Sequence, residues 1–254
     1  MRFELLTDGI YRLKVPFENI FTSVFALVED NNCILLDSGC NEWDVNQIII
    51  PALDAARFVP QMMICSHLHS DHSGGMQALL KAFPKAKAGL FARNKYFDGE
   101  TIHLSDGGLL LNRFRVLNLK GHTDDCLAVL DEKTSTLLSF DCLQLFGVGR
   151  YGTSVTDCGD YLLTLERVRS LNPKKIIASH EYVPCGFCAY GHKEVEKYLD
   201  QCKEMLDYVA ELAKENPSRN PKELAKLYNE ANPSLPPIGT TIMSAVLRWK
   251  NEKR

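Results

Sequence analysis

The feature that most constrains the fold of this chain is a ten-residue segment with three imidazoles and one carboxylate within six residues, Ser66-His67-Leu68-His69-Ser70-Asp71-His72-Ser73-Gly74-Gly75. It follows an apolar run and precedes a run with helical spacing, so it is predicted to be a loop between a strand and a helix. Side chains alternate along extended backbone, so His67 and His69 project to the same side. The following turn brings Asp71 and His72 round from another direction. One loop can therefore supply two adjacent metal ions.

The ligand types in this loop indicate a divalent transition metal. Imidazole nitrogen and carboxylate oxygen suit zinc, and also iron or manganese, so the sequence does not select among the three. The alternative is a helix cap, with Ser70 or Asp71 as the capping residue. A cap needs one such residue and leaves the histidines unexplained, so we favour the metal site.

The size and charge of the chain limit its class and its partners. A chain of 254 residues can build one large core, with or without a helical appendage. The hydrophobic fraction of 45% and charged fraction of 24% are typical of a soluble globular protein. The net charge of -3 gives no electrostatic reason to expect nucleic acid or an anionic membrane as partner. The partner that we expect is a small-molecule substrate.

The N-terminal residues predict a cytoplasmic protein with reduced cysteines. Residues 1–9 contain acidic side chains and a glycine where a secretory signal would need an unbroken apolar core. No later run reaches membrane-spanning length. The nine cysteines are therefore expected to be reduced thiols rather than a disulfide framework.

Hydrophobic patterning predicts intermixed strands and helices, followed by helices alone. Residues 10–15, 23–28 and 33–36 are expected to form an antiparallel meander, and residues 42–57 a helix with a kink or break at Pro51. The other expected elements are strands at 58–65, 86–91, 114–119, 126–130, 136–140 and, as the last strand, 176–179, and helices at 76–83, 161–171, 192–214, 221–229 and 240–250. This order favours sheets packed between helix layers over residues 1–190, with a helical extension at 191–254.

Three more candidate ligands follow other predicted strands. His122, Asp141 and His180 each come at or just after a strand end, where rigid backbone carries side chains into a shared crevice. The two oxygens of Asp141 can bridge two ions. Only His103 and His192 of the seven histidines lie outside the combined set, and we expect those two to be surface residues.

The order His-x-His-x-Asp-His, followed by His, Asp and His, resembles the metallo-β-lactamase superfamily over about the first 185 residues. The resemblance implies a mixed α/β (α+β) fold, namely a four-layer αββα sandwich with a dinuclear site at one edge, here with a C-terminal helical extension. It also implies that one metal ion is held by His67, His69 and His122 and the other by Asp71, His72 and His180, and that Asp141 bridges the two.

The ligand set is more similar to hydroxyacylglutathione hydrolases and acyl-homoserine lactonases than to other branches of the superfamily. Class B1 β-lactamases place a cysteine where Asp141 stands, and flavodiiron-type members place glutamate where His69 stands. Two positions depart from the usual pattern. Asp124-Asp125 replaces a frequent Pro-Gly pair, and Phe140 precedes Asp141 where glycine is common. The second departure leaves Asp157 as an alternative bridge.

The resemblance implies hydrolysis of a small ester, thioester or lactone. Two divalent metal ions, with zinc as the first choice, would supply hydroxide from a shared water and polarise the substrate carbonyl. Asp71 would orient that water and pass on a proton. Residues 144–153 are rich in glycine, and there Arg150 and Tyr151 are predicted to bind a carboxylate or phosphate and to donate to the oxyanion. A plain surface turn is the alternative for this segment.

Several features keep alternatives open. Residues 17–21 are predicted to be a loop, whose two aromatic residues either form an apolar wall of the site or pack into the core. Cys185 and Cys188 form a lone Cys-x-x-Cys, for which a redox or metal role is the weaker interpretation. The terminal helices pack on the sandwich, cover the site or join a second subunit in a homodimer. The alternative functions are a phosphodiesterase of the same fold and a metal-retaining regulatory or binding protein.

Overall fold

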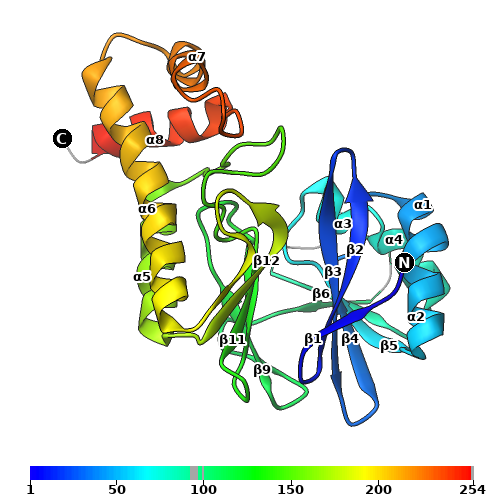
Figure 1. Cartoon of the computed structure of the whole chain (residues 1–254). Coiled ribbons are helices and arrows are strands. Elements are labelled where there is room, and N and C mark those ends of the chain that lie inside the picture. Colours follow the sequence, from blue (N-terminus) through cyan, green and yellow to red (C-terminus); the bar gives the residue numbers. More distant parts are fainter. Residues whose placement is uncertain (92–96, 99, 253–254) are drawn as a thin grey trace. The chain divides into compact units, whose positions relative to one another are not determined.

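The computed structural model of the chain describes residues 1–91, 97–98 and 100–252. The chain forms two compact units (Figure 1). The first comprises Met1–Asn118 with Leu127–Thr134, and the second comprises Leu119–Cys126 with Ser135–Arg254. The domain boundary predicted after residue 190 stays a prediction.

A seven-stranded sheet forms the centre of the first unit, with its strands in chain order. Strands β1 to β4 are antiparallel and β4 to β7 are parallel. The predicted meander over residues 10–36 is confirmed by β2, β3 and β4. The strand bounds are Glu4–Thr7 (β1), Ile10–Phe17 (β2), Ile20–Glu29 (β3), Asn32–Leu36 (β4), Pro60–Ile64 (β5), Lys87–Leu90 (β6) and Thr101–His103 (β7).

Helices cover one face of this sheet (Figure 1). The segment predicted to kink or break at Pro51 does not break there and is helical throughout, as α1 (Glu42–Asp44), the π-helical stretch η1 (Val45–Ile49) and α2 (Ile50–Ala56). Helix α2 continues directly from η1, with Ile49 and Ile50 in the helical region and the Ile50 N–H donating to the Val45 carbonyl, so Pro51 lies inside a continuous helical segment. The helices bury Ile49, Leu53 and Leu79 against Leu35 and Met63 of the sheet. The short helix α3 (Ser70–Ser73) and helix α4 (Met76–Ala82) complete this layer.

Two glycines let the histidine segment lie against the chain that follows β4. A Cβ atom at Gly74 would lie 1.9 Å from the backbone oxygen of Cys40, and one at Gly75 would lie 2.1 Å from that of Ser38. No other residue fits these positions without moving the backbone. The backbone N–H of Ser38 donates to the His72 carbonyl at 2.8 Å, which fixes the same contact.

The first unit also contains three antiparallel strands, β8 (Leu109–Leu110), β9 (Phe114–Asn118) and β10 (Leu127–Asp131). Strands β9 and β10 confirm the predicted strands at 114–119 and 126–130, each within one residue. The two-residue strand β8 was not predicted, because two residues are too few to show a period of two.

The second unit combines three strands with four long helices. Strand β11 (Thr136–Phe140) pairs in parallel with β12 (Lys175–Tyr182), and helix α5 (Cys158–Leu171) connects them. Strand β13 (Gly186–Tyr190) then pairs with β12 in antiparallel orientation, so the prediction that the last strand lies at 176–179 is wrong. Helix α6 (His192–Glu215) packs on β12, β13 and α5, and contacts α7 (Pro221–Ala231) and α8 (Thr240–Glu252) (Figure 1).

Within residues 1–91, 97–98 and 100–252, none of the helices combines the length and the apolar character needed to cross a lipid bilayer. All nine cysteines are free thiols, as predicted.

Candidate metal centre

The predicted ligands divide between the two units. His67, His69, Asp71 and His72 belong to the first unit, whereas His122, Asp141 and His180 belong to the second.

The first residue of the histidine segment, Ser66, is hydrogen-bonded to the buried carboxylate of Asp37, which directly follows strand β4. Both the backbone N–H of Ser66, at 2.7 Å, and its hydroxyl, at 2.9 Å, donate to the two oxygens of Asp37. Asp37 is fully buried and has a left-handed φ of 66°. Asp37 was not among the predicted site residues, although a carboxylate directly after a buried apolar run was a usable signal.

Asp37 also orients His72. The Nδ1 atom of His72 lies 2.7 Å from Asp37 Oδ2, and the side chains of both residues are fully buried. Because the carboxylate accepts a hydrogen bond there, the lone pair of His72 lies on Nε2, which is 3.2 Å from Oδ2 of Asp71. Burial raises the pKa of the Asp37 carboxyl, and its hydrogen bonds from His72 and Ser66 act in the opposite direction.

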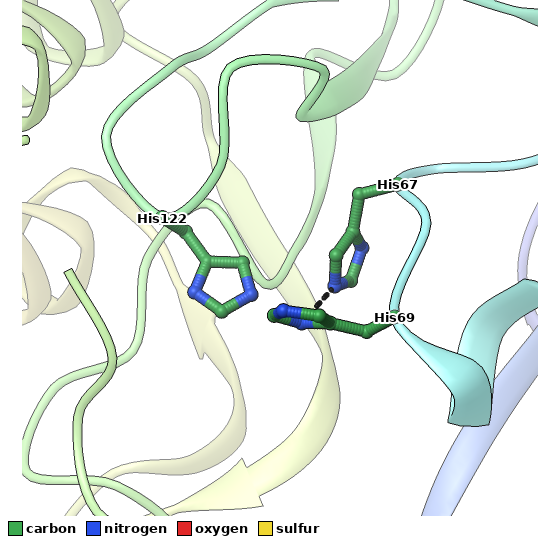
Figure 2. Close-up of side chains that lie close together, drawn as sticks. All are labelled: His67, His69 and His122. Carbon is green, nitrogen blue, oxygen red and sulfur yellow. Dashed lines mark hydrogen bonds between the residues drawn. The ribbon is translucent and has the colours of Figure 1, made fainter. Parts of the chain in front are cut away.

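The imidazoles of His67 and His69 meet, as the alternation of extended backbone predicted. His67 Nε2 lies 2.9 Å from His69 Nδ1, and the ring planes are inclined by 77° (Figure 2). The other nitrogen of His67 lies 3.1 Å from the hydroxyl of Ser66. His67 is buried and His69 is exposed.

Asp71 is not a helix cap. The residue at the N-cap of α3 is His69, and its side chain makes no capping hydrogen bond. Oδ2 of Asp71 instead accepts a hydrogen bond from the hydroxyl of Thr22, at 3.0 Å. Thr22 is buried in β3, 49 residues away in sequence. The helix-cap alternative for this segment is therefore wrong.

In the second unit, two histidines face the carboxylate of Asp141. His180 Nε2 lies 3.5 Å from Asp141 Oδ1, and His122 Nε2 lies 4.0 Å from Asp141 Oδ2. All three side chains are buried. Asp141 directly follows β11, as predicted, whereas His180 lies inside β12 rather than after the strand end.

The ring of His122 is oriented by the main chain. Its Nδ1 atom lies 2.6 Å from the backbone oxygen of Ser154. A carbonyl oxygen only accepts, so Nδ1 carries the proton and Nε2 has the lone pair. The preceding Gly121 has a φ of +121°, and a Cβ atom there would lie 2.5 Å from the Cα atom of Tyr161 in α5. Figure 2 shows His122 on this loop.

These donors fit a divalent transition metal. Histidines that ligate metal usually donate their other ring N–H to a carboxylate or a backbone carbonyl, as His72 does to Asp37 and His122 does to Ser154. Donor atoms about 2.0–2.1 Å from a tetrahedral zinc ion lie roughly 3.3 Å apart. The donor pairs His72–Asp71 and His180–Asp141 are separated by 3.2 and 3.5 Å.

The residues predicted to contact substrate, Arg150 and Tyr151, lie next to each other in a tight turn. Val148 and Tyr151 form an isolated antiparallel bridge. The guanidinium of Arg150 donates to the Tyr151 hydroxyl at 3.3 Å and lies 5.4 Å from the centroid of its ring. Arg150 is exposed and Tyr151 is partly buried. A contact between these side chains and a substrate stays a prediction.

The segment 17–21 is not a loop. Only Glu18 and Asn19 form the turn between β2 and β3, and Phe21 lies in β3. The ammonium of Lys14 lies 4.4 Å from the centroid of the Phe21 ring, and the guanidinium carbon of Arg12 lies 5.3 Å from it. The ring of Phe21 therefore makes cation–π contacts.

Two other candidates of the sequence analysis have structural contacts. Asp157 is the N-cap residue of α5, where its side chain accepts a hydrogen bond from the Asp160 N–H at 2.8 Å. The Cys185 thiol donates to Gln201 Oε1 at 2.8 Å, and burial raises the pKa of that thiol. A raised pKa leaves less of the nucleophilic thiolate at neutral pH than an exposed thiol has.

The mixed sheets, the helices and the histidine and aspartate donors define a protein of the α/β class with candidate metal ligands. A family model described as "Metallo-beta-lactamase superfamily" matches residues 19–90. The chain is 29% identical over 196 residues to hydroxyacylglutathione hydrolase 1 of Vibrio vulnificus, a match that covers 74% of this chain and 75% of that protein.

Two further comparisons agree. A match with the hydroxyacylglutathione hydrolase of Francisella tularensis subsp. holarctica, at 29% identity, covers 48% of this chain and half of that protein's length. The crystal structure of a metallo-beta-lactamase family protein from Thermus thermophilus superposes with a TM-score of 0.72 at 17% identity, and the match covers 98% of this chain and 95% of that one. The family-model match and the hydroxyacylglutathione hydrolase relatives support the predicted resemblance to the metallo-β-lactamase superfamily. The predicted fold class, an α/β sandwich with C-terminal helices, is confirmed.

Proposed function

We propose that this chain is a metal-dependent hydrolase that cleaves a small ester, thioester or lactone. The relatives that support this proposal include hydroxyacylglutathione hydrolases and, at 23% identity, an atrochrysone carboxyl ACP thioesterase of Pseudocercospora fijiensis. Intact donors in both units favour a catalytic role over a binding role that merely retains the fold.

We further propose that the seven predicted ligands hold two divalent ions, with zinc as the first choice and iron or manganese as alternatives. His67, His69 and His122 would hold one ion, and Asp71, His72 and His180 the other, with Asp141 bridging. The observation that carries this proposal is the orientation of His72 and His122 by Asp37 and Ser154, respectively. Each bond directs the lone pair of Nε2 toward a neighbouring carboxylate.

The protein's own residues would orient the reactants. When bound, divalent cations would lower the pKa of a water molecule and polarise the scissile carbonyl. Asp71, held by the Thr22 hydroxyl, would accept and pass on a proton. Arg150 would bind an anionic group of the substrate, and the hydroxyl of Tyr151 would donate to the developing oxyanion.

A substrate panel tests the proposed function. Metal-loaded protein would be assayed with an acylglutathione thioester, an acyl-homoserine lactone and bis(p-nitrophenyl) phosphate, before and after treatment with a chelator. We expect turnover of the thioester or the lactone that is lost on chelation and restored by added Zn²⁺, Mn²⁺ or Fe²⁺. Turnover of the phosphodiester alone would instead identify a phosphodiesterase. Absence of turnover on all three with metal bound would favour a binding role.

The contact between Thr22 and Asp71 leads to a separate prediction. Thr22→Val removes the hydroxyl that orients the Asp71 carboxylate and keeps the shape of the side chain. We expect metal affinity to fall by about 10- to 100-fold, as is usual when a group that orients a ligand is removed. Competition with a chromophoric chelator would measure the affinity. Thr164→Val is the matched control, because its hydroxyl donates to the Lys120 carbonyl at 2.7 Å and is equally buried. Equal affinities of the two variants would refute the orienting role of Thr22.

A further inference from the structure

Gln144 is a buried amide in an apolar part of the second unit, three residues after Asp141. It is 4% exposed and stands between the buried residues Leu143 and Leu145. Burying an amide costs free energy unless its polar atoms find partners. The partners of the Gln144 amide therefore indicate its structural role.

The amide of Gln144 has a defined orientation. The backbone N–H of Ser154 donates to Oε1 at 2.7 Å, and this bond requires the oxygen at that position and so assigns the amide nitrogen to the other side. The nitrogen, Nε2, donates to Oδ2 of Asp141 at 3.5 Å. It also lies 2.9 Å from Nδ1 of His122, but Nδ1 gives its proton to Ser154, so this approach is a contact and not a hydrogen bond. One amide thus lies beside both residues.

Gln144 acts on His122 through Ser154. The carbonyl of Ser154 accepts the Nδ1–H of His122, and the N–H of the same residue donates to Gln144. Fixing Ser154 therefore fixes the acceptor that sets the ring angle and the tautomer of His122. The Nε2–H group of Gln144 also points a donor at the Asp141 carboxylate.

Hydrogen bonds to Leu143 and Leu145 fix the backbone on either side of Gln144, and so fix the position of its Cα atom. The Tyr198 hydroxyl of α6 donates to the Leu143 carbonyl at 3.3 Å. The Thr153 hydroxyl donates to the Leu145 carbonyl at 2.6 Å. The Gln144 N–H itself lies 3.5 Å from the Tyr161 hydroxyl of α5.

We propose that Gln144 is a positioning residue for His122, which would hold one ion, and for Asp141, which would be shared by both. This inference rests on the proposed function. Gln144 is not itself a ligand, because Oε1 accepts from Ser154 and an amide nitrogen has no available lone pair. Its effect is to hold two donors in the orientation that binds metal.

Gln144→Met tests the proposal, because methionine keeps the length of the side chain and removes the amide oxygen and the amide nitrogen. Thr153→Val is the control, because it removes a buried hydroxyl from the same loop without touching a predicted ligand. Metal would be stripped from each protein and titrated back against a chromophoric chelator, with elemental analysis for stoichiometry. The melting temperature of each metal-free protein would report the structural cost.

We expect Gln144→Met to bind metal about 10- to 100-fold more weakly than the wild type, the usual effect of losing such a supporting group. The metal affinity of Thr153→Val should stay within about threefold of the wild-type value. We expect this even if the melting temperature of metal-free Thr153→Val falls as far as that of metal-free Gln144→Met. If Gln144→Met does not fold, Gln144→Asn takes its place, since asparagine keeps the amide but is too short to span Ser154 and Asp141. The same loss of affinity is expected there.

The outcomes separate this inference from the proposed function. A wild-type protein that binds no divalent metal overturns both. If the wild-type protein binds metal and the Gln144 variants bind it within threefold of the same affinity, the positioning role alone is overturned. Equal losses of affinity in Gln144→Met and Thr153→Val also overturn it, because they would show a general effect on the loop.

Discussion

Asp141→Ala is expected to lower the bound metal to at most one ion per chain and to reduce kcat/KM for the best substrate by about 10³-fold or more, which corresponds to roughly 4 kcal/mol of transition-state stabilisation. The physical reason is that the bridging carboxylate is the one proposed ligand that neutralises charge on both ions. Its removal also leaves His122 and His180, which lie 4.0 and 3.5 Å from its oxygens, without the group that they share. Elemental analysis and steady-state kinetics would measure the two effects, and His67→Ala should likewise lose metal.

Asp157→Asn is the matched control for Asp141→Ala. Asp157 was the alternative bridge, and in the structure its side chain caps α5 through the Asp160 N–H. Asparagine is as good an N-cap as aspartate, so this variant should keep its metal, its activity and its stability. Loss of metal from Asp157→Asn but not from Asp141→Ala would reverse the assignment. Unchanged metal in both Asp141→Ala and His67→Ala would defeat the ligand set as a whole.

The sequence predicted best the elements that are buried and regular. Strand β11 was predicted at its observed bounds, because all five of its residues are buried and polar turn residues flank it. Helix α5 was predicted to start three residues late, since Cys158 to Asp160 have no apolar spacing. Strand β13 was missed because three of its five residues are only half-buried and none of its apolar positions alternates clearly.

The predicted ligands could be proposed from the sequence because His and Asp at these spacings carry chemical information on their own. The residues that orient the ligands could not. Ser154 holds His122 through its backbone carbonyl, a group that every residue has. Thr22 meets Asp71 only because the first unit folds β3 against α3. Contacts of this kind arise from tertiary structure and leave no local pattern.

Arg113→Met is expected to lower the free energy of unfolding by about 3–5 kcal/mol, the usual cost of removing one partner of a buried ion pair. Arg113 precedes β9 and is 7% exposed. Its Nε and Nη2 atoms donate to the two oxygens of Asp131, at 2.7 and 2.8 Å, and it also pairs with Glu29 at the end of β3. The Nη2 atom also donates to the backbone carbonyl of Asp8 at 2.6 Å. Methionine would leave the Asp131 carboxylate buried without its counter-charge. Urea denaturation would measure the change.

The dependence of this loss on pH separates the charge of Arg113 from its packing. Burial raises the pKa of Asp131, but hydrogen bonds from Arg113, Thr134 and the Lys133 N–H outweigh it, so the net pKa is lowered. A lowered pKa in the folded state gives stability that is present above the unfolded value of about 3.9 and is lost as the pH falls through the folded value. In Arg113→Met burial dominates and the pKa of Asp131 rises. The difference between the two proteins should therefore be largest at neutral pH and should shrink below about pH 4.

Arg115→Met is the matched control for this prediction. Arg115 lies two residues further along, in β9, and its Nε atom donates to Glu132 Oε1 at 2.7 Å, but the two side chains are 36% and 41% exposed. An exposed ion pair contributes about 0–1 kcal/mol because water and salt screen it. A difference between the variants thus measures burial of the pair rather than loss of an arginine. The prediction would be wrong if Arg113→Met lowered the free energy of unfolding no more than Arg115→Met does, or if its loss did not change with pH. Either result would mean that other groups compensate the charge of Asp131 and that the buried Arg113–Asp131 pair contributes little to stability.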